Sequence, residues 1–78
     1  MRRREARLIV AFRTTHDAMT FEDYCHQRGA EGRLIPLPRE ISAGCGLAWS
    51  APPEDEDGLR KLLDAAGIEA QHVRLLEI

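Results

Sequence analysis

Cys45 is the side chain whose neighbours most clearly suggest chemistry. It lies between Gly44 and Gly46 and follows a segment, 35–42, that contains two prolines, an arginine and a serine. Because glycine carries no side chain, we expect the sulfur of Cys45 to be accessible. The thiolate form of cysteine attacks electrophiles and other sulfur atoms. Cys45 is therefore the candidate nucleophile, and the alternative is a small residue in a glycine turn.

Two residues of the preceding segment could support a thiolate at Cys45. Arg39 would add a permanent positive charge, although it could instead be a solvated loop residue or pair with Glu40. Ser42 could donate a hydrogen bond to the sulfur, although a serine in a loop more often bonds to nearby backbone groups. Both residues are therefore candidate supporting residues.

Three further residues could act on a thiolate at the same place. His16 stands near the start of a predicted helix and could accept or donate a proton, although a surface role is more common there. The backbone amides around Gly44 and Gly46 could bind an anion. We include His16 and both glycines among the supporting residues.

The hydrophobic pattern predicts six elements in the order β-α-β-β-α-β. They are a strand over 7–12, a helix from Thr14 or Thr15 to a stop at Gly29, strands over 32–37 and 46–50, a helix from Glu54 to Gly67, and a strand over 71–77. In a chain of this length the order predicts a ferredoxin-like α+β fold. Its four antiparallel strands would form one sheet with two helices on one face, and the other face would be open or pair with a partner.

The predicted topology brings Cys45 to the start of the first helix. The loop before the third strand and the N-terminus of that helix lie at the same end of the sheet. Unpaired amides at a helix N-terminus favour an anion, so a thiolate is stabilised there. The third strand also carries Trp49, which we expect in the core, although on the open face it would mark a partner surface.

The second cysteine, Cys25, is expected to be structural. It lies nine residues beyond His16 on the predicted helix, which is roughly 13 Å along the axis. Cys25 and Cys45 should therefore lie towards opposite ends of the domain, too far apart for a disulfide. Free cysteine is among the most often buried residues, so we assign Cys25 to the core.

Composition predicts one globular domain over 1–78, with a flexible stretch at Met1 to Glu5. Hydrophobic residues make up 44% and charged residues 31%, which is typical of a folded globular protein. A net charge of −2 argues against general nucleic-acid binding. No apolar run approaches the roughly 20 residues that cross a bilayer, so we expect a cytoplasmic protein without a membrane partner. The histidines and cysteines show no ligand spacing, and we expect neither a metal nor an organic cofactor.

Several motifs give the chain a family resemblance. They are a strand ending in Phe12, Thr-His-Asp-Ala at 15–18, Arg-Leu-Ile-Pro-Leu-Pro-Arg-Glu-Ile-Ser at 33–42, and the signature Pro-Arg-x-Ile-Ser-x-x-Cys-Gly that ends at Gly46. Over nearly its whole length the chain resembles the small bacterial Se/S carrier protein-like family, a domain of unknown function. The resemblance implies that Cys45 holds sulfur or selenium as a persulfide or selenopersulfide.

The chain departs from related patterns at two points. The better-known small carriers of the tRNA-thiolation relay use Cys-Pro-x-Pro at a helix start, whereas this chain has Cys45 followed by Gly46. Their mechanism therefore does not transfer directly. Many members of the resembled family have a small polar residue where this chain has Gly44, which removes one hydrogen bond to the sulfur.

Three functional hypotheses follow. The first is a covalent carrier, rather than a complete enzyme, that receives sulfur or selenium on Cys45 from a donor such as a cysteine desulfurase and passes it to an acceptor protein. The second is a non-catalytic ferredoxin-like module that forms a homodimer or binds another partner, and in which Cys45 is incidental. The third is a thiol redox sensor.

Overall fold

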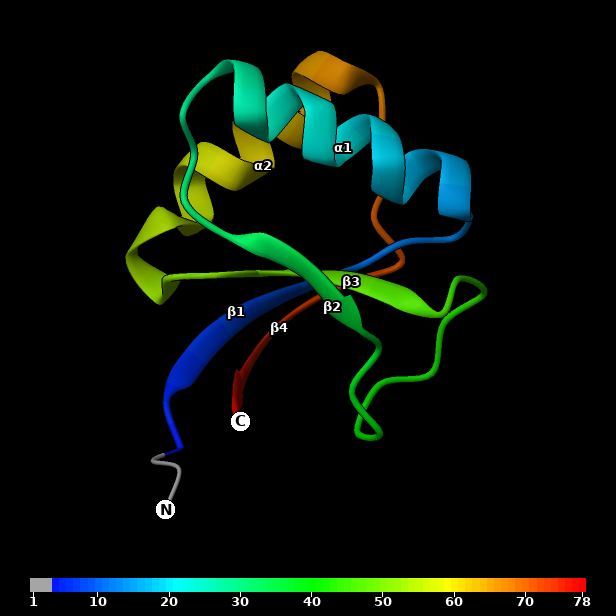
Figure 1. Cartoon of the computed structure of the whole chain (residues 1–78), viewed down its shortest axis with the longest axis vertical. Helices are drawn as coiled ribbons and strands as arrows, with labels where there is room; N and C mark the ends of the chain where they lie inside the picture. Colours follow the sequence, from blue (N-terminus) through cyan, green and yellow to red (C-terminus); the bar gives the residue numbers. More distant parts are fainter. Residues whose placement is uncertain (1–3) are drawn as a thin grey trace.

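The computed structural model describes residues 4–78 of the chain. Its elements follow the order predicted from the sequence (Figure 1). They are β1 (Ala6–Ala11), α1 (Thr15–Gln27), β2 (Arg33–Pro36), β3 (Leu47–Ala51), the short 3₁₀ turn η1 (Pro53–Asp55), α2 (Glu56–Ala66) and β4 (His72–Glu77).

Within the described residues the strands form one antiparallel sheet in the order β2-β3-β1-β4. The two central strands, β1 and β3, pair Val10 with Trp49, and β4 pairs Val73 with Val10 on the other side. Both helices lie on one side of this sheet (Figure 1). The predicted ferredoxin-like α+β fold is therefore confirmed.

Local sequence signals account for the ends of α1. Thr14 is the N-cap, and its side chain accepts a hydrogen bond from the backbone N–H of Asp17 at 3.1 Å. Gly29 follows the helix with a φ of 67°, which is costly for residues with a side chain. Both the predicted start and the predicted stop of this helix are confirmed.

The second helix begins slightly later than predicted. The chain first makes the 3₁₀ turn at 53–55, and α2 starts at Glu56. Such turns are common at helix N-termini, and Pro53 has no N–H that needs a partner there. Glu56 and Asp57 occupy the first turn of α2, where the helix dipole favours acidic residues.

The sheet face without helices is partly covered by the chain itself. The connection between β2 and β3 places Ile41 in a buried cluster with Ile9, Ala11 and Ala48, which project from β1 and β3. Ile41 is only 4% exposed. Where the sequence predicted a face that is open or paired with a partner, the structure shows a loop docked on that face.

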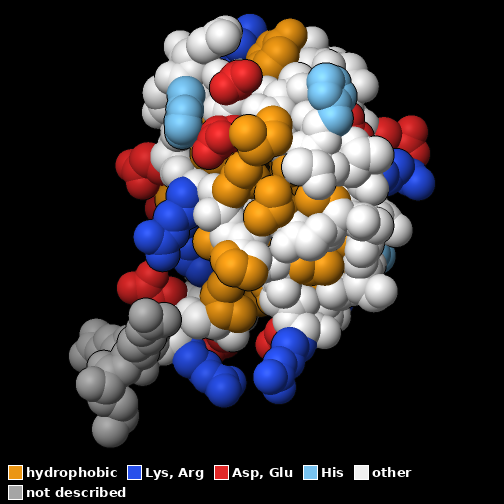
Figure 2. Space-filling model, turned by 45° about the vertical axis from the view of Figure 1, so that its right-hand side comes forward, with side chains coloured by type: hydrophobic (Ala, Val, Ile, Leu, Met, Phe, Trp, Pro, Cys, Tyr) orange, Lys and Arg blue, Asp and Glu red, His pale blue; other side chains and the backbone are white. Residues whose placement is uncertain are grey.

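Some hydrophobic surface remains exposed. Met19 is 50% exposed, Leu75 61% and Ile78 41%. Figure 2 shows hydrophobic side chains gathered in a band on one side of the molecule, with charged groups towards its edges. No helix among residues 4–78 is long and apolar enough to cross a membrane.

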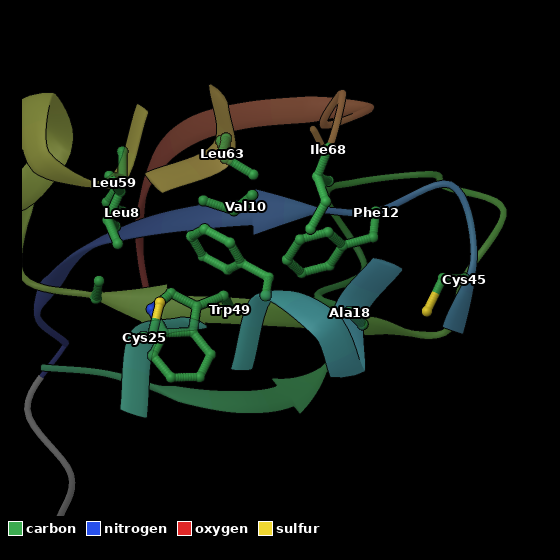
Figure 3. Close-up of a cluster of buried hydrophobic side chains, with 12 residues drawn as sticks. Leu8, Val10, Phe12, Ala18, Cys25, Cys45, Trp49, Leu59, Leu63 and Ile68 are labelled. Atoms are coloured by element: carbon green, nitrogen blue, oxygen red, sulfur yellow. The ribbon is translucent and has the colours of Figure 1, made fainter. Parts of the chain in front are cut away.

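The main core lies between the sheet and the helices (Figure 3). Phe21 contacts Phe12 with ring centroids 5.6 Å apart and Trp49 with ring centroids 5.9 Å apart. Trp49 is fully buried in this cluster, which confirms its assignment to the core. The core therefore fixes α1 directly against the central strand β3.

The predicted flexible stretch, Met1 to Glu5, falls mostly outside the described residues, since residues 1–3 are not described. Glu5 exchanges two backbone hydrogen bonds with Ile78, at 3.1 and 3.0 Å. These bonds continue the pairing of β1 with β4 by one residue.

Candidate functional site

Cys45 lies against the start of α1. Its backbone N–H donates to the carbonyl oxygen of Phe12 at 3.3 Å, which attaches it to the end of β1. Its Sγ lies 3.8 Å from Oγ1 of Thr15, the first residue of α1. The predicted neighbourhood of the cysteine and the helix N-terminus is therefore confirmed.

The expectation of an accessible sulfur is wrong for this state of the protein. Cys45 is only 3% exposed and belongs to the main core cluster, together with Phe12 and Ala18. The flanking residues Gly44 and Gly46 are exposed. The glycines therefore face solvent while the side chain between them is packed inward.

The two glycines beside Cys45 have different structural roles. A Cβ on Gly44 would lie 2.6 Å from the carbonyl oxygen of Arg13, whereas a Cβ on Gly46 would meet nothing within 4 Å. The N–H of Gly44 donates to Oε1 of Gln71 at 3.0 Å. The amides of Gly44 and Cys45 therefore both have hydrogen-bond partners within the protein.

The structure does not bring the other predicted supporting side chains to the sulfur. Arg39, Ser42 and His16 are all exposed. Within residues 4–78 none of these three side chains makes a hydrogen bond or an ion pair, with Cys45 or with any other group. Ser42 takes part through its backbone carbonyl, which accepts from Nε2 of His72 at 2.9 Å.

Sequence reasoning missed four residues that shape this site. Thr15 lies beside the sulfur, and Gln71, His72 and Arg74 bond to backbone atoms of the loop before Cys45. The sequence offers one usable signal for His72 and Arg74, because polar and apolar residues alternate from His72 to Leu75 in β4. Their partners in the loop could not be read from that alternation.

Cys25 has the properties of a structural residue. It is fully buried, and this burial raises the pKa of its thiol to about 11. Both cysteines are free, and Figure 3 shows Cys25 and Cys45 at opposite ends of the core cluster, as predicted. Residues 4–78 contain no group of three or more His, Cys, Asp or Glu that could hold a metal ion.

The contact between Thr15 and Cys45 predicts that the Thr15 hydroxyl affects the rate at which the Cys45 thiol reacts. Thr15→Val keeps the shape of the side chain but removes the hydroxyl, so a thiolate at Cys45 loses a hydrogen-bond donor worth about 1 kcal/mol. We expect Cys45 to react about fivefold more slowly with a disulfide reagent, measured by mass spectrometry. Thr15→Ser retains the hydroxyl and is expected to keep the parent rate. Equal rates in all three proteins would contradict a role for this hydroxyl.

Comparison with known proteins identifies the family. A family model described as "Putative Se/S carrier protein-like" matches residues 7–73, which include Cys45, both helices and most of the sheet. No curated protein and no solved structure matches the chain. The family match leaves out only the first six and the last five of the 78 residues. The chain therefore belongs to the Se/S carrier protein-like family.

Proposed function

We propose that this protein carries sulfur or selenium on Cys45, as a persulfide or selenopersulfide, between a donor enzyme and an acceptor. Membership of the family supports a carrier of these elements in general. The observation that supports Cys45 as the bearing residue is its position, with Sγ 3.8 Å from Thr15 Oγ1 at the start of α1. Cys25 is a poorer candidate, because burial raises the pKa of its thiol to about 11.

The position suits a sulfur anion. The first amides of an α-helix have no partner within the helix, and the helix dipole places partial positive charge at the same end. The hydroxyl of Thr15 can donate to the sulfur from the same turn. A sulfur atom bound to Cys45 would therefore lie beside a hydrogen-bond donor and the first turn of α1.

Loading and unloading are two exchange reactions at sulfur. In the first, the Cys45 thiolate attacks the outer sulfur of a persulfide on the donor enzyme, a new S–S bond forms, and the donor cysteine leaves as a thiolate. In the second, an acceptor nucleophile attacks the outer sulfur on Cys45, and the Cys45 thiolate is released. Neither step needs an oxidant or a reductant, because one S–S bond forms as another breaks and the outer sulfur keeps its oxidation state. Selenium would follow the same two steps.

The partners of this proposal are proteins. The donor would resemble a cysteine desulfurase, which presents its sulfur as an enzyme persulfide, and the acceptor would be a second protein nucleophile. Large hydrophobic side chains remain exposed, with Leu75 at 61% and Met19 at 50%. The band of hydrophobic side chains in Figure 2 is the kind of surface that contacts other proteins.

Intact-mass measurement tests the proposal. After incubation with a cysteine desulfurase and cysteine, we expect the protein to gain the mass of one sulfur atom, and we expect dithiothreitol to remove it. Cys45→Ala should gain nothing, whereas Cys25→Ala should load like the parent protein. Circular dichroism would verify that both variants fold. An unchanged parent mass, as an interaction module predicts, or equal loading of Cys45→Ala would overturn the proposal.

A further inference from the structure

We infer that the connection between β2 and β3 is a strap that closes over the site, and that side chains at the start of β4 hold it shut. The strap consists of residues 37–46 and ends with Cys45 and Gly46. This inference rests on the proposed function, since the purpose of the strap is to bury the sulfur that Cys45 carries. The holding residues are Gln71, His72 and Arg74.

Three side chains form hydrogen bonds with the strap, and the strap residues that they bond are two apart: Glu40, Ser42 and Gly44. Arg74 Nη1 donates to the carbonyl oxygen of Glu40 at 3.1 Å, and His72 Nε2 lies 2.9 Å from the carbonyl oxygen of Ser42. Because a carbonyl oxygen can only accept, Nε2 of His72 is the donor in this bond. The third contact is the bond from the N–H of Gly44 to Gln71 Oε1. All three contacts involve backbone atoms of the strap, so they fix its path rather than one of its side chains.

Apolar contacts position the middle of the strap. Ile41 is 4% exposed and packs with residues of β1 and β3 on the face of the sheet without helices. Leu37 and Ala43 are partly buried against the same cluster. The strap thus crosses the sheet from β2, at one edge, to the side chains of β4, at the other.

The end of the strap couples this docking to the sulfur. Gly44 bonds to Gln71, and the next residue, Cys45, donates its N–H to Phe12. Gly44 also passes so close to Arg13 that a Cβ would lie 2.6 Å from the carbonyl oxygen of that residue. Displacing Gly44 from this position therefore displaces Cys45 from the core, where it is 3% exposed.

The strap can open without loss of the sheet. The first and last residues of the strap are joined by a hydrogen bond, from the N–H of Leu37 to the carbonyl oxygen of Gly46 at 3.0 Å. The pairing of β1 with β3 involves residues 48–51 of β3, which all follow the strap. Opening between Leu37 and Gly46 leaves the sheet, both helices and the buried Cys25 in place. The inferred motion is therefore local.

Such a strap meets a chemical requirement of a carrier. The outer sulfur of a persulfide is open to attack by any thiol, so an exposed cargo is lost between donor and acceptor. A buried Cys45 avoids this loss, but it must become exposed when a partner delivers or removes sulfur. The structure therefore assigns Gln71, His72 and Arg74 as positioning residues that set how often Cys45 is open.

Alkylation of the two cysteines tests the inference without any donor enzyme. Iodoacetamide is added to the native protein, and the labelling rate of each cysteine is measured by mass spectrometry of peptides. We expect Gln71→Leu to raise the Cys45 rate about fivefold, because one hydrogen bond of the closed state is lost. Adding Arg74→Ala should raise it about fivefold again. Gln71→Glu keeps an acceptor for the Gly44 N–H and should keep the parent rate.

Cys25 is the internal control, because it is fully buried and lies at the other end of the core cluster from Cys45. If the strap opens locally, the rate at which iodoacetamide labels Cys25 stays at the parent value in every variant. The inference is overturned if Cys45 labelling is unchanged in the double variant, or if Cys25 labelling rises in step with it, which would show global unfolding instead. If the variants are alkylated faster but the protein is never loaded with sulfur, the inference about the strap stands and only the proposed carrier function is overturned.

Discussion

Gly44→Ala is expected to destabilise the protein by about 1–3 kcal/mol, the usual cost of forcing extra atoms into a packed site. The new Cβ would lie 2.6 Å from the carbonyl oxygen of Arg13. This contact is with backbone, which cannot rotate away as a side chain can. The strap must shift instead, which weakens the bond between Gly44 and Gln71 and withdraws Cys45 from the core. Urea denaturation followed by circular dichroism measures the free energy of unfolding.

Gly46→Ala is the matched control on the other side of the cysteine. A Cβ at this position meets nothing within 4 Å, and the backbone is not in the left-handed region. We expect this variant to have the stability of the parent, or to gain about 0.4–1 kcal/mol through lower entropy of the unfolded chain. If both variants lost the same stability, the close approach of Gly44 to Arg13 would not be what fixes the end of the strap.

Phe21→Ala is expected to have the largest effect on stability, a loss of about 3–5 kcal/mol. Phe21 is fully buried on α1, and its ring contacts Phe12 at 5.6 Å and Trp49 at 5.9 Å. Removing it leaves a cavity between the helix and the sheet. The free energy of unfolding of a protein domain is only about 5–15 kcal/mol, so this loss would remove much of the stability. The measurement is the urea concentration at the midpoint of unfolding, compared between proteins whose unfolding free energy depends on urea with the same slope.

Met19→Ala is the control for this change. Met19 lies on the same helix but is 50% exposed, so its truncation should alter the free energy of unfolding by less than about 0.5 kcal/mol. Alanine is the better helix former at both positions, so a similar loss from Met19→Ala and Phe21→Ala would contradict a special role for the aromatic cluster. A loss below about 1 kcal/mol in Phe21→Ala would also contradict the close packing of its ring against Phe12 and Trp49.

The fold could be predicted because its signals are local. The Thr14 cap, the glycines that end both helices and the alternation of apolar residues each act within a few residues of the chain. Together they give six elements in an order that few topologies satisfy. The error at α2 was small and had a local cause, the proline at 53 that favours a 3₁₀ turn first.

The site was only partly predictable because it depends on contacts across the chain. Topology alone places Cys45 near the start of α1, as the structure confirms. Its burial depends on where the strap docks, and this depends on Gln71 and Ile41 meeting partners far away in sequence. No local pattern encodes these pairings. Glycines on both sides of Cys45 predict an accessible sulfur, but Gly44 instead allows the backbone to pack tightly against Arg13, and the sulfur is buried.

The central claim is that Cys45, and not Cys25, bears the transferred atom. The most direct test loads the protein with a cysteine desulfurase and cysteine, caps all thiols and persulfides without a reductant, and locates the added sulfur by peptide mass spectrometry. We predict one additional sulfur atom on the peptide that contains Cys45 and none on the peptide that contains Cys25. Added sulfur on Cys25, or none on either peptide while the desulfurase turns over, would contradict the account.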